Sequence, residues 1–200
     1  MKKAILTLFA AVALSFSASA QIDFGVEGGA AANWIPKTTK GLGATVLPKI
    51  GFYAGAFGIF EFSETMVGQV EVMYAMKGYA EKTALNSKYS IALSYIEVPV
   101  MVGWKMADDM FTIKVGPEFD FCIGGSIHDG PYTYKETDHK PFQLLVAVQT
   151  TYMFNENFGV DVKFDAGVTR TFNDYTLSGE LIHDKGRNAS IRVGLRYCFN

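Results

Sequence analysis

Hydrophobic and polar residues alternate along most of the chain with the period of two that is typical of β-strands. The alternation is clearest in residues 190–199, where the odd-numbered residues are bulky and apolar and the even-numbered ones are small, polar or charged. The same pattern predicts eight strands. They lie near residues 22–34, 49–61, 66–78, 89–104, 110–123, 141–153, 158–171 and 189–199.

The connections between these segments alternate between long and short. The short ones are residues 62–65, 105–109 and 154–157, and the long ones are residues 35–48, 79–88, 124–140 and 172–188. Each segment is also long enough for a tilted membrane-crossing strand, which takes about 9–11 residues. Outer-membrane barrels combine tight periplasmic turns with long extracellular loops. We therefore expect an all-β protein, an eight-stranded antiparallel transmembrane β-barrel with short periplasmic turns and long extracellular loops.

Aromatic residues gather at both ends of the expected strands. Such residues favour strands in general, but here two bands emerge from a single strand assignment, as expected for side chains that prefer the membrane interface. The periplasmic band is Phe60, Trp104, Phe111, Tyr152, Phe158, Tyr197 and Phe199, and the outer band is Trp34, Tyr79, Tyr89, Phe121, Phe142 and Phe172.

Composition narrows the class of protein further. Hydrophobic residues make up 49% of the chain and charged residues 19%, which excludes a disordered chain. The net charge is −2 and no segment is strongly basic, so nucleic acid is not an expected partner. A soluble lipocalin-like barrel would need an apolar interior and a polar exterior. The strands in residues 110–123, 158–171 and 189–199 predict the reverse, with outer-membrane lipid around the barrel.

The first twenty residues have the features of a signal peptide. Lys2 and Lys3 precede an apolar run over residues 4–16, and the small-residue pattern of residues 18–20 comes just before Gln21. We expect cleavage before Gln21, which leaves residues 21–200 as the barrel domain. No later run is long and apolar enough for a transmembrane helix. The expected location is the cell outer membrane, after export by the Sec signal peptide, with the outer-membrane barrel assembly machinery as a partner.

Many positions that are predicted to face the barrel interior carry a charge. An eight-stranded barrel is filled by its own side chains, and an unpaired ion in such a lumen would cost several kcal/mol. We therefore expect a network of ion pairs with trapped water. Its predicted members are Glu71, Lys77, Glu97, Lys114, Glu118, Lys163, Asp165, Arg192 and Arg196, and the inward positions also include Lys105, Asp120 and Asp161.

The tight turn between the fourth and fifth segments suggests one register. Residues whose numbers sum to about 215 would face each other across these two strands. Glu97 would then lie opposite Glu118, and these like charges would need a cation such as Arg192 or Lys163. The main interpretation is a salt-bridged plug. The alternative is a buried acidic site that binds a proton or a cation.

The same register brings Pro99 and Pro117 close together. Proline has no N–H and removes a hydrogen bond from the strand ladder, where no water can replace it. We expect a bulge or kink shared by the two strands. The alternative is a seam at which the barrel wall opens laterally.

The two cysteines are expected at opposite ends of the barrel. Cys122 lies at the outer end of its strand and Cys198 at the periplasmic end. Their separation would be close to the membrane height of about 25 Å. A disulfide needs Cα atoms within about 7 Å, so we expect no bond between them.

Several of these segments resemble the PorT-like outer-membrane β-barrel family, which is common in Bacteroidetes. Residues 70–78 (Val-Glu-Val-Met-Tyr-Ala-Met-Lys-Gly) resemble its third strand, and residues 95–102, which contain Glu97-Val98-Pro99, resemble its most specific strand. Residues 115–117 and 158–160 resemble its next and seventh strands. The resemblance covers essentially all of the mature chain. Such barrels usually end on an aromatic residue, whereas Asn200 ends this chain.

The resemblance implies an accessory role in protein secretion or surface assembly, with type IX secretion components as partners. The alternative is a structural or adhesive barrel of the OmpX type, which binds external ligands through its loops. Residues 132–136 (Tyr-Thr-Tyr-Lys-Glu) are predicted contact points at a loop tip. A loop-based enzyme is the third hypothesis.

The enzyme hypothesis depends on the histidines. His128, His139 and His183 all fall in expected outer loops, each beside an acidic residue, and Ser126 and Ser178 are nearby in the sequence. Such residues could form a catalytic triad if the loops converge. The sequence has no spaced catalytic signature such as G-x-S-x-G and no His-x-x-x-His metal motif. We therefore expect no enzymatic activity, no cofactor and no metal site.

Overall fold

In the computed structural model of the protein, the described residues are 22–35, 45–82, 88–107, 110–137, 139–173, 175–177, 180–182 and 186–199. The predicted signal peptide lies outside them. Within these ranges no helix has the length and apolarity to span a membrane. The strands are β1 (Ile22–Trp34), β2 (Thr45–Glu61), β3 (Met66–Lys82), β4 (Lys88–Met106), β5 (Phe111–Asp129), β6 (Tyr132–Lys135), β7 (Phe142–Met153), β8 (Phe158–Gly167), β9 (Tyr175–Leu177), β10 (Glu180–Ile182) and β11 (Ala189–Phe199).

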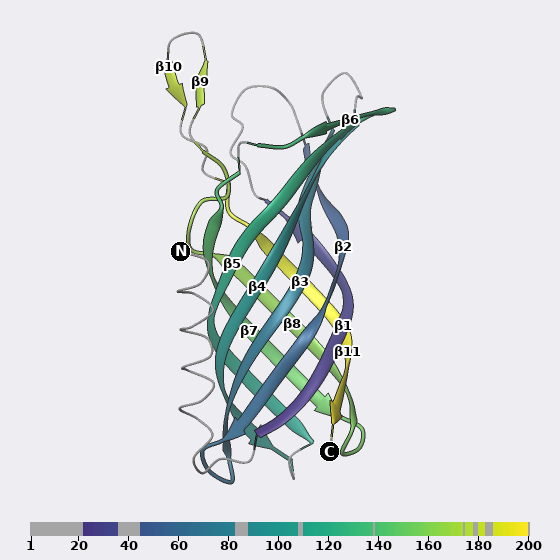
Figure 1. Cartoon of the computed structure of the whole chain (residues 1–200), viewed down its shortest axis with the longest axis vertical. Coiled ribbons are helices and arrows are strands. Elements are labelled where there is room, and N and C mark those ends of the chain that lie inside the picture. The colour runs from purple at the N-terminus through teal and green to yellow at the C-terminus, as the bar shows by residue number, and fades with distance from the viewer. Residues whose placement is uncertain are drawn as a thin grey trace.

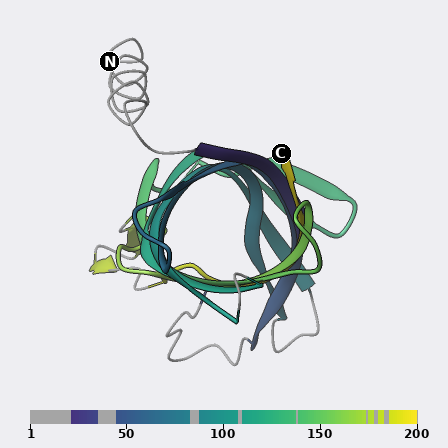
Figure 2. The same cartoon turned by 90° about the horizontal axis from the view of Figure 1, so that it is seen from below.

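Eight of these strands form one closed antiparallel barrel (Figure 1). Each pairs with its neighbours in the order β1, β2, β3, β4, β5, β7, β8 and β11, and β11 pairs with β1 to close the ring. Figure 2 shows the ring along the barrel axis. β6 extends the sheet from β5, and β9 and β10 form a separate two-stranded sheet. The expected eight-stranded antiparallel barrel is therefore confirmed.

The two ends of the barrel differ. At one end, which we call the turn end, tight turns join β2 to β3, β4 to β5 and β7 to β8 (Figure 1). Backbone hydrogen bonds close these turns, from Phe62 N to Met66 O at 2.9 Å, from Met110 N to Ala107 O at 3.2 Å and from Phe154 N to Phe158 O at 2.8 Å. β1 begins and β11 ends there. At the opposite end, which we call the loop end, β5 and β6 project beyond the ring (Figure 1).

Side chains on each strand alternate between an apolar outer face and a polar lumen. In β11, for example, Leu195 is 67% exposed whereas its neighbour Arg196 is 2% exposed. The outer positions of β5, β7 and β8 are likewise exposed and apolar, and include Ile113, Val148 and Phe164. This arrangement is the reverse of a water-soluble barrel and suits an outer face that lies in lipid.

Several strands run further toward the loop end than the sequence predicted. β3 continues to Lys82 and β5 to Asp129, and β6, β9 and β10 lie in segments that were predicted to be loops. The predicted loops are therefore wrong at residues 79–82, 88, 124–129, 132–135, 175–177 and 180–182.

Backbone irregularities explain why the pattern failed there. The β2–β3 register shifts between Pro48 and Tyr53, and the β4–β5 register shifts between Ser94 and Tyr95. Gly78 of β3 has a φ of 146°. The two register shifts place an extra residue in β2 and in β5. A bulge changes which face the following residues point to, so the period of two is interrupted in β2 and β5 although each strand continues.

The predicted outer aromatic band needs one correction. Tyr79 is 1% exposed and Phe172 is 5% exposed, so neither lies on the outer face. Both belong to an apolar cluster inside the loop end, which also contains Ile35, Ile91 and Leu93, and Tyr89 of the predicted band packs against this cluster as well. Tyr79 follows the inward parity of β3, and Phe172 lies in a returning segment that forms a β-bridge with His139.

The two prolines lie beside gaps in the strand pairing. Near the prolines, the pairing of β4 with β3 is interrupted at Val98 and Pro99. Its pairing with β5 is interrupted at Val100 and Met101, which lie opposite Pro117 and its neighbour. The register is the same on both sides of each gap. We propose that the prolines cause these gaps, because neither can donate a ladder hydrogen bond.

Candidate functional site

The middle of the lumen contains a group of buried charged side chains, which we call the central network. They project from β3, β4, β5, β8 and β11, and each is at most 2% exposed. Alternate residues of a strand share a face, which is why strands far apart in sequence present charges to one space. The members are Glu71, Lys77, Glu97, Glu118, Asp120, Lys163, Asp165 and Arg192.

Lys77 is the hub of the central network. Its Nζ lies 2.8 Å from Glu97 Oε1, 3.1 Å from Glu118 Oε1, 2.7 Å from Asp120 Oδ2 and 3.4 Å from Asp165 Oδ1. These four carboxylates therefore share one ammonium group. The ring of Tyr95 lies above the same ammonium, with 5.7 Å between Nζ and the ring centroid.

Arg192 and Lys163 supply the other positive charges. Arg192 forms a two-pronged pair with Glu97, with Nη1–Oε2 at 2.5 Å and Nη2–Oε1 at 2.9 Å. Its Nη2 also lies 3.2 Å from Glu118 Oε1 and 3.0 Å from Asp165 Oδ2. Lys163 Nζ lies 2.8 Å from Glu71 Oε2 and 3.1 Å from Glu118 Oε2. Glu118 thus contacts three cations.

Three carboxylates of the network, Glu97, Glu118 and Asp120, are close enough together to resemble a metal site. However, Lys77 Nζ lies within ion-pair distance of all three, so an ammonium group already stands where a metal ion would bind. The geometry favours the salt-bridged plug over the alternative of a cation site.

The predicted register between β4 and β5 is wrong by two residues. Glu97 pairs with Asp120, and Glu118 pairs with Pro99 instead. The last pair before the turn is Met106 with Phe111, so the turn is centred further along the chain than the sequence suggested. Glu97 and Glu118 still meet through the cations that they share.

A second polar group lies nearer the turn end and is called the turn-end cluster. Lys114 Nζ donates to Gln69 Oε1 at 2.7 Å and to Thr151 Oγ1 at 2.8 Å. Arg196 donates to the same two oxygens, at 3.2 Å and 3.0 Å. Thr151 in turn donates to Asp161. The members are Glu27, Gln69, Lys114, Gln149, Thr151, Asp161 and Arg196.

Arg196 joins this cluster to acidic groups. Its Nε lies 3.3 Å from Asp161 Oδ2, and its Nη2 lies 3.4 Å from Glu27 Oε2. Its guanidinium carbon is 3.9 Å from the ring centroid of Phe57, which is a cation–π contact. Gln69 connects the two groups of charges, because its amide donates to Glu71 Oε1 at 2.5 Å.

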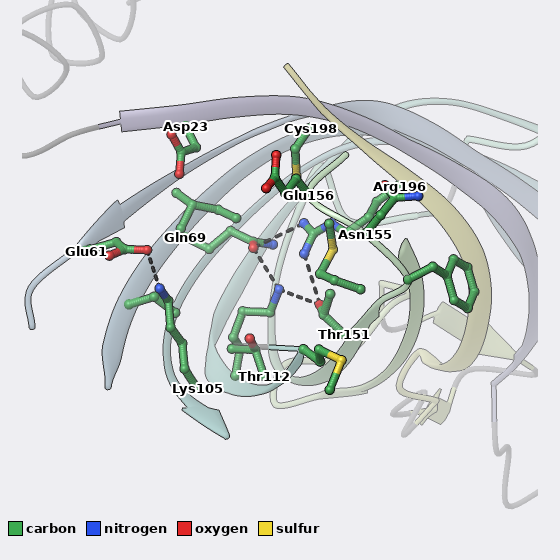
Figure 3. Close-up of a pocket in the computed structure, with 16 residues that line it drawn as sticks. Asp23, Glu61, Gln69, Lys105, Thr112, Thr151, Asn155, Glu156, Arg196 and Cys198 are labelled. Atoms are coloured by element: carbon green, nitrogen blue, oxygen red, sulfur yellow. Dashed lines mark hydrogen bonds and ion pairs between the residues drawn. The ribbon is translucent and has the colours of Figure 1, made fainter. Parts of the chain in front are cut away.

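A cavity of about 460 Å³ is lined by part of the turn-end cluster and by residues of the tight turns. Gln69, Thr151 and Arg196 lie close together in it, and Glu61 pairs with Lys105 on another side (Figure 3). The remaining lining residues are Asp23, Ile59, Val67, Met110, Thr112, Lys114, Met153, Phe154, Asn155, Glu156 and Cys198.

Neutral polar and apolar side chains fill the lumen at the loop end. The hydroxyl of Tyr95 accepts hydrogen bonds from Gln143 Nε2 at 2.6 Å and from Asn188 Nδ2 at 3.3 Å. Beyond this layer lies the apolar cluster of Tyr79, Leu93 and their neighbours. The lumen is therefore filled in its middle and at its loop end.

The structure brings together the charged residues that the sequence placed in the interior. Eight of the twelve belong to the central network and three to the turn-end cluster, while Lys105 lines the cavity. Sequence reasoning missed Glu27 and the buried amides of Gln69, Gln143 and Gln149. Glu27 could have been found, because it shares the odd-numbered face of β1 with Asn33, and that face points into the lumen.

The histidines do not form a described catalytic triad. His128 Nε2 is 3.2 Å from Ser126 Oγ, but its Nδ1 is 3.0 Å from the hydroxyl of Thr133 rather than from a carboxylate. Ser126, His128 and Thr133 all lie on the β5–β6 hairpin. The backbone of His139 forms an isolated β-bridge with Phe172. His183 and Ser178 lie outside the described residues.

The β5–β6 hairpin carries two exposed aromatic side chains. Tyr132 is 65% exposed and Tyr134 is 56% exposed. Their ring centroids are 6.4 Å apart and the ring planes differ by 30°. These are residues of the predicted contact segment, and the structure presents them on a strand beyond the barrel rim.

Cys122 and Cys198 are both free thiols. Cys122 pairs across the sheet with Tyr95 near the loop end, whereas Cys198 pairs with Gly25 near the turn end. The strands therefore hold them at opposite ends of the barrel.

Comparison with known families agrees with this geometry. A family model described as "Outer membrane protein beta-barrel domain" matches residues 14–173. No match was found among curated proteins.

Solved structures share the fold at low sequence identity. Neisserial surface protein A (NspA) is 14% identical, with a TM-score of 0.57 over 88% of this chain and 97% of that chain. Ail, the attachment invasion locus protein of Yersinia pestis, is 10% identical, with a TM-score of 0.50 over 88% of this chain and 98% of that chain. Such likeness shows that the chain is similar to these barrels in fold.

Proposed function

We propose, from the premise that the chain belongs to the outer membrane protein beta-barrel domain family, that this protein is a non-enzymatic barrel that contacts another macromolecule outside the cell. Its location is the outer membrane. The apolar outer face lies in lipid there, the turn end faces the periplasm and the loop end faces outward.

The observation that carries this proposal is the β5–β6 hairpin. It projects beyond the ring at the loop end (Figure 1) and presents Tyr132 and Tyr134 to solvent. Tyrosine offers a large, rigid contact area together with a hydroxyl group, which suits protein recognition. Among the described residues, β6 pairs only with β5. Its other edge is therefore available to a strand of a partner.

The filled lumen supports contact over transport as the main role. The central network and the loop-end cluster occupy the lumen with side chains that are almost fully buried. The arrangement at His128 supports a non-enzymatic role, since its Nδ1 contacts the Thr133 hydroxyl, whereas in a catalytic triad a carboxylate orients the ring.

Site-specific photocrosslinking in living cells tests the proposal. A photoreactive phenylalanine analogue in place of Tyr132 should capture an extracellular macromolecule. The same analogue in place of Phe154, an exposed residue at the turn end, is the matched control and should not capture that species. Capture from position 154 alone, or from neither position, would contradict an external contact role for the hairpin.

The second candidate is an accessory to type IX secretion or surface assembly. The observation that favours it is the resemblance of residues 95–102 to the Glu-x-Pro strand of the PorT-like family. Purification from native outer membranes in mild detergent separates the two candidates. Stoichiometric secretion-channel components would favour the accessory role, whereas a lone barrel would leave the external contact role.

The proposal also covers how the chain is exported and inserted into the outer membrane. Residues 1–20 act as a signal peptide that is removed before Gln21, and the barrel assembly machinery inserts residues 21–200. N-terminal sequencing of protein from the outer membrane tests the cleavage site, because the mature chain should begin with Gln21.

A further inference from the structure

The turn-end cavity contains an unusual lysine. Lys114 is 1% exposed, yet no carboxylate of the described residues lies within ion-pair distance of its Nζ. The other four cations of the described lumen that are at most 2% exposed each have at least two carboxylate partners. These cations are Lys77, Lys163, Arg192 and Arg196.

The neutral partners of Lys114 are already in use. Gln69 Oε1 and Thr151 Oγ1 each accept from Lys114 and also from Arg196. Two positive groups therefore share two neutral oxygens. An ammonium group has three donors, and the described residues supply acceptors for two of them. A buried cation with an unused donor is costly unless another acceptor reaches it.

A ligand in the cavity could bring such an acceptor to Lys114. Its volume of about 460 Å³ is within the range of small-molecule sites, about 300–1,000 Å³. Lys114 and Arg196 line its buried part. Met110 and Phe154 of the tight turns line it as well, so the cavity lies at the periplasmic end of the barrel.

The rim of the cavity has the opposite charge. Asp23, Glu61 and Glu156 all line it, and they are more exposed than Lys114. Glu61 pairs with Lys105 there (Figure 3). A simple anion would meet these acids on its way in. A ligand that carries an anionic group at one end and a cationic group at the other matches both the buried part and the rim.

We propose that this cavity binds a small zwitterion, an amino acid or short peptide with free ends, with its carboxylate at Lys114 and its ammonium group at the rim carboxylates. Apolar side chains of Met110, Met153 and Phe154 line the cavity and accommodate an aliphatic side chain. This site is independent of the external contact role, because it lies at the other end of the barrel.

Binding of the dipeptide alanyl-leucine to the full mature barrel in lipid nanodiscs tests the proposal. The probe is added to protein with labelled methionine methyl groups, and the signals of Met110 and Met153 are followed by NMR. The free dipeptide should shift both signals saturably. Alanyl-leucinamide, which lacks the carboxylate, and N-acetyl-alanyl-leucine, which lacks the ammonium group, should each bind about tenfold more weakly or worse, because each loses a charge-assisted contact.

Two variants connect the binding to named residues. Lys114→Met should abolish the saturable shift, and Glu61→Gln, at the exposed rim, should weaken it while leaving the barrel folded. Lys135→Met on the distant hairpin is the matched control and should bind like the wild type. The proposal is overturned if the free dipeptide causes no saturable shift, if either blocked dipeptide binds as tightly as the free one, or if folded Lys114→Met binds normally.

Discussion

At Lys77, one ammonium group neutralises several carboxylates in a space without bulk water. Transfer of an ion out of water costs several kcal/mol even after relaxation. The attraction of neighbouring opposite charges offsets this cost only when their geometry is close. The four contacts of Lys77, at 2.7–3.4 Å, meet that condition.

Replacement of this ammonium should therefore destabilise the barrel strongly. Lys77→Met keeps most of the length of the side chain but leaves Glu97, Asp120 and their neighbours without their shared cation. We expect a loss of about 3–5 kcal/mol in the free energy of unfolding. Urea unfolding in lipid vesicles, followed by tryptophan fluorescence, measures it.

Two further variants show whether charge is the cause. Lys135→Met removes an exposed lysine from β6 and should change stability by less than about 0.5 kcal/mol. Lys77→Met combined with Asp120→Asn should recover part of the loss, because one fewer carboxylate is left unpaired. Unfolding of Lys77→Met at the wild-type urea concentration would refute the role assigned to this residue.

The sequence predicted which way single charged side chains face better than it predicted their partners. The inward position of Lys77 or Arg192 follows from alternation alone, because a charge in such a strand cannot face lipid. The partners do not follow from alternation, since they depend on the register between strands. The predicted register was wrong by two residues, so that Glu97 pairs with Asp120 and not with Glu118. Tyr79 was misplaced because an aromatic residue is acceptable both in lipid and in an apolar cluster.

At the scale of the strand, Gly78 shows how β3 continues past its apparent end. Its φ of 146° lies in a region that L side chains rarely adopt. A Cβ at this position would lie 2.0 Å from the carbonyl oxygen of Ile91 on β4. The strand can therefore extend to Lys82 only because residue 78 has no side chain.

Substitution of Gly78 should separate β3 from β4 at this point. Gly78→Ala is expected to cost about 2 kcal/mol or more, from backbone strain and from the contact with the Ile91 carbonyl. Gly124→Ala is the matched control, because nothing lies within 4 Å of a Cβ there. Urea unfolding of the two variants in the same vesicles should separate them, and equal midpoints would show that β3 tolerates a side chain at residue 78.

The strand boundaries that the sequence predicted well are those without irregularities. β1 and β11 match their predicted ranges, because alternation holds from end to end. The extensions of β2, β3 and β5 lie beyond a register shift or the unusual Gly78. Periodicity carries little information across a register shift, because the phase of the pattern changes while hydrogen bonding continues. In β3 the alternation is hidden around Gly78 because residues 77–81 are all buried.

At the scale of the whole molecule, the two ends of the barrel differ in structure. The loop end is closed by Tyr95, Gln143 and the apolar cluster, and it presents the β5–β6 hairpin outward. The turn end contains the cavity. The alternation of turns and loops predicted this polarity, but it could not predict the cavity, because a void depends on side-chain packing rather than on the order of strands.

This arrangement predicts that the protein forms no steady aqueous channel. An eight-stranded barrel has an interior just wide enough to be filled by side chains, and here the central network and the loop-end cluster fill it between the cavity and the outside. Purified protein in a planar lipid bilayer should therefore show a baseline current at all moderate voltages, while a wide porin in the same chamber shows stepwise openings. Reproducible steps from the purified barrel would mean that the salt-bridged side chains move aside under voltage, and the central network would then be a gate rather than a plug.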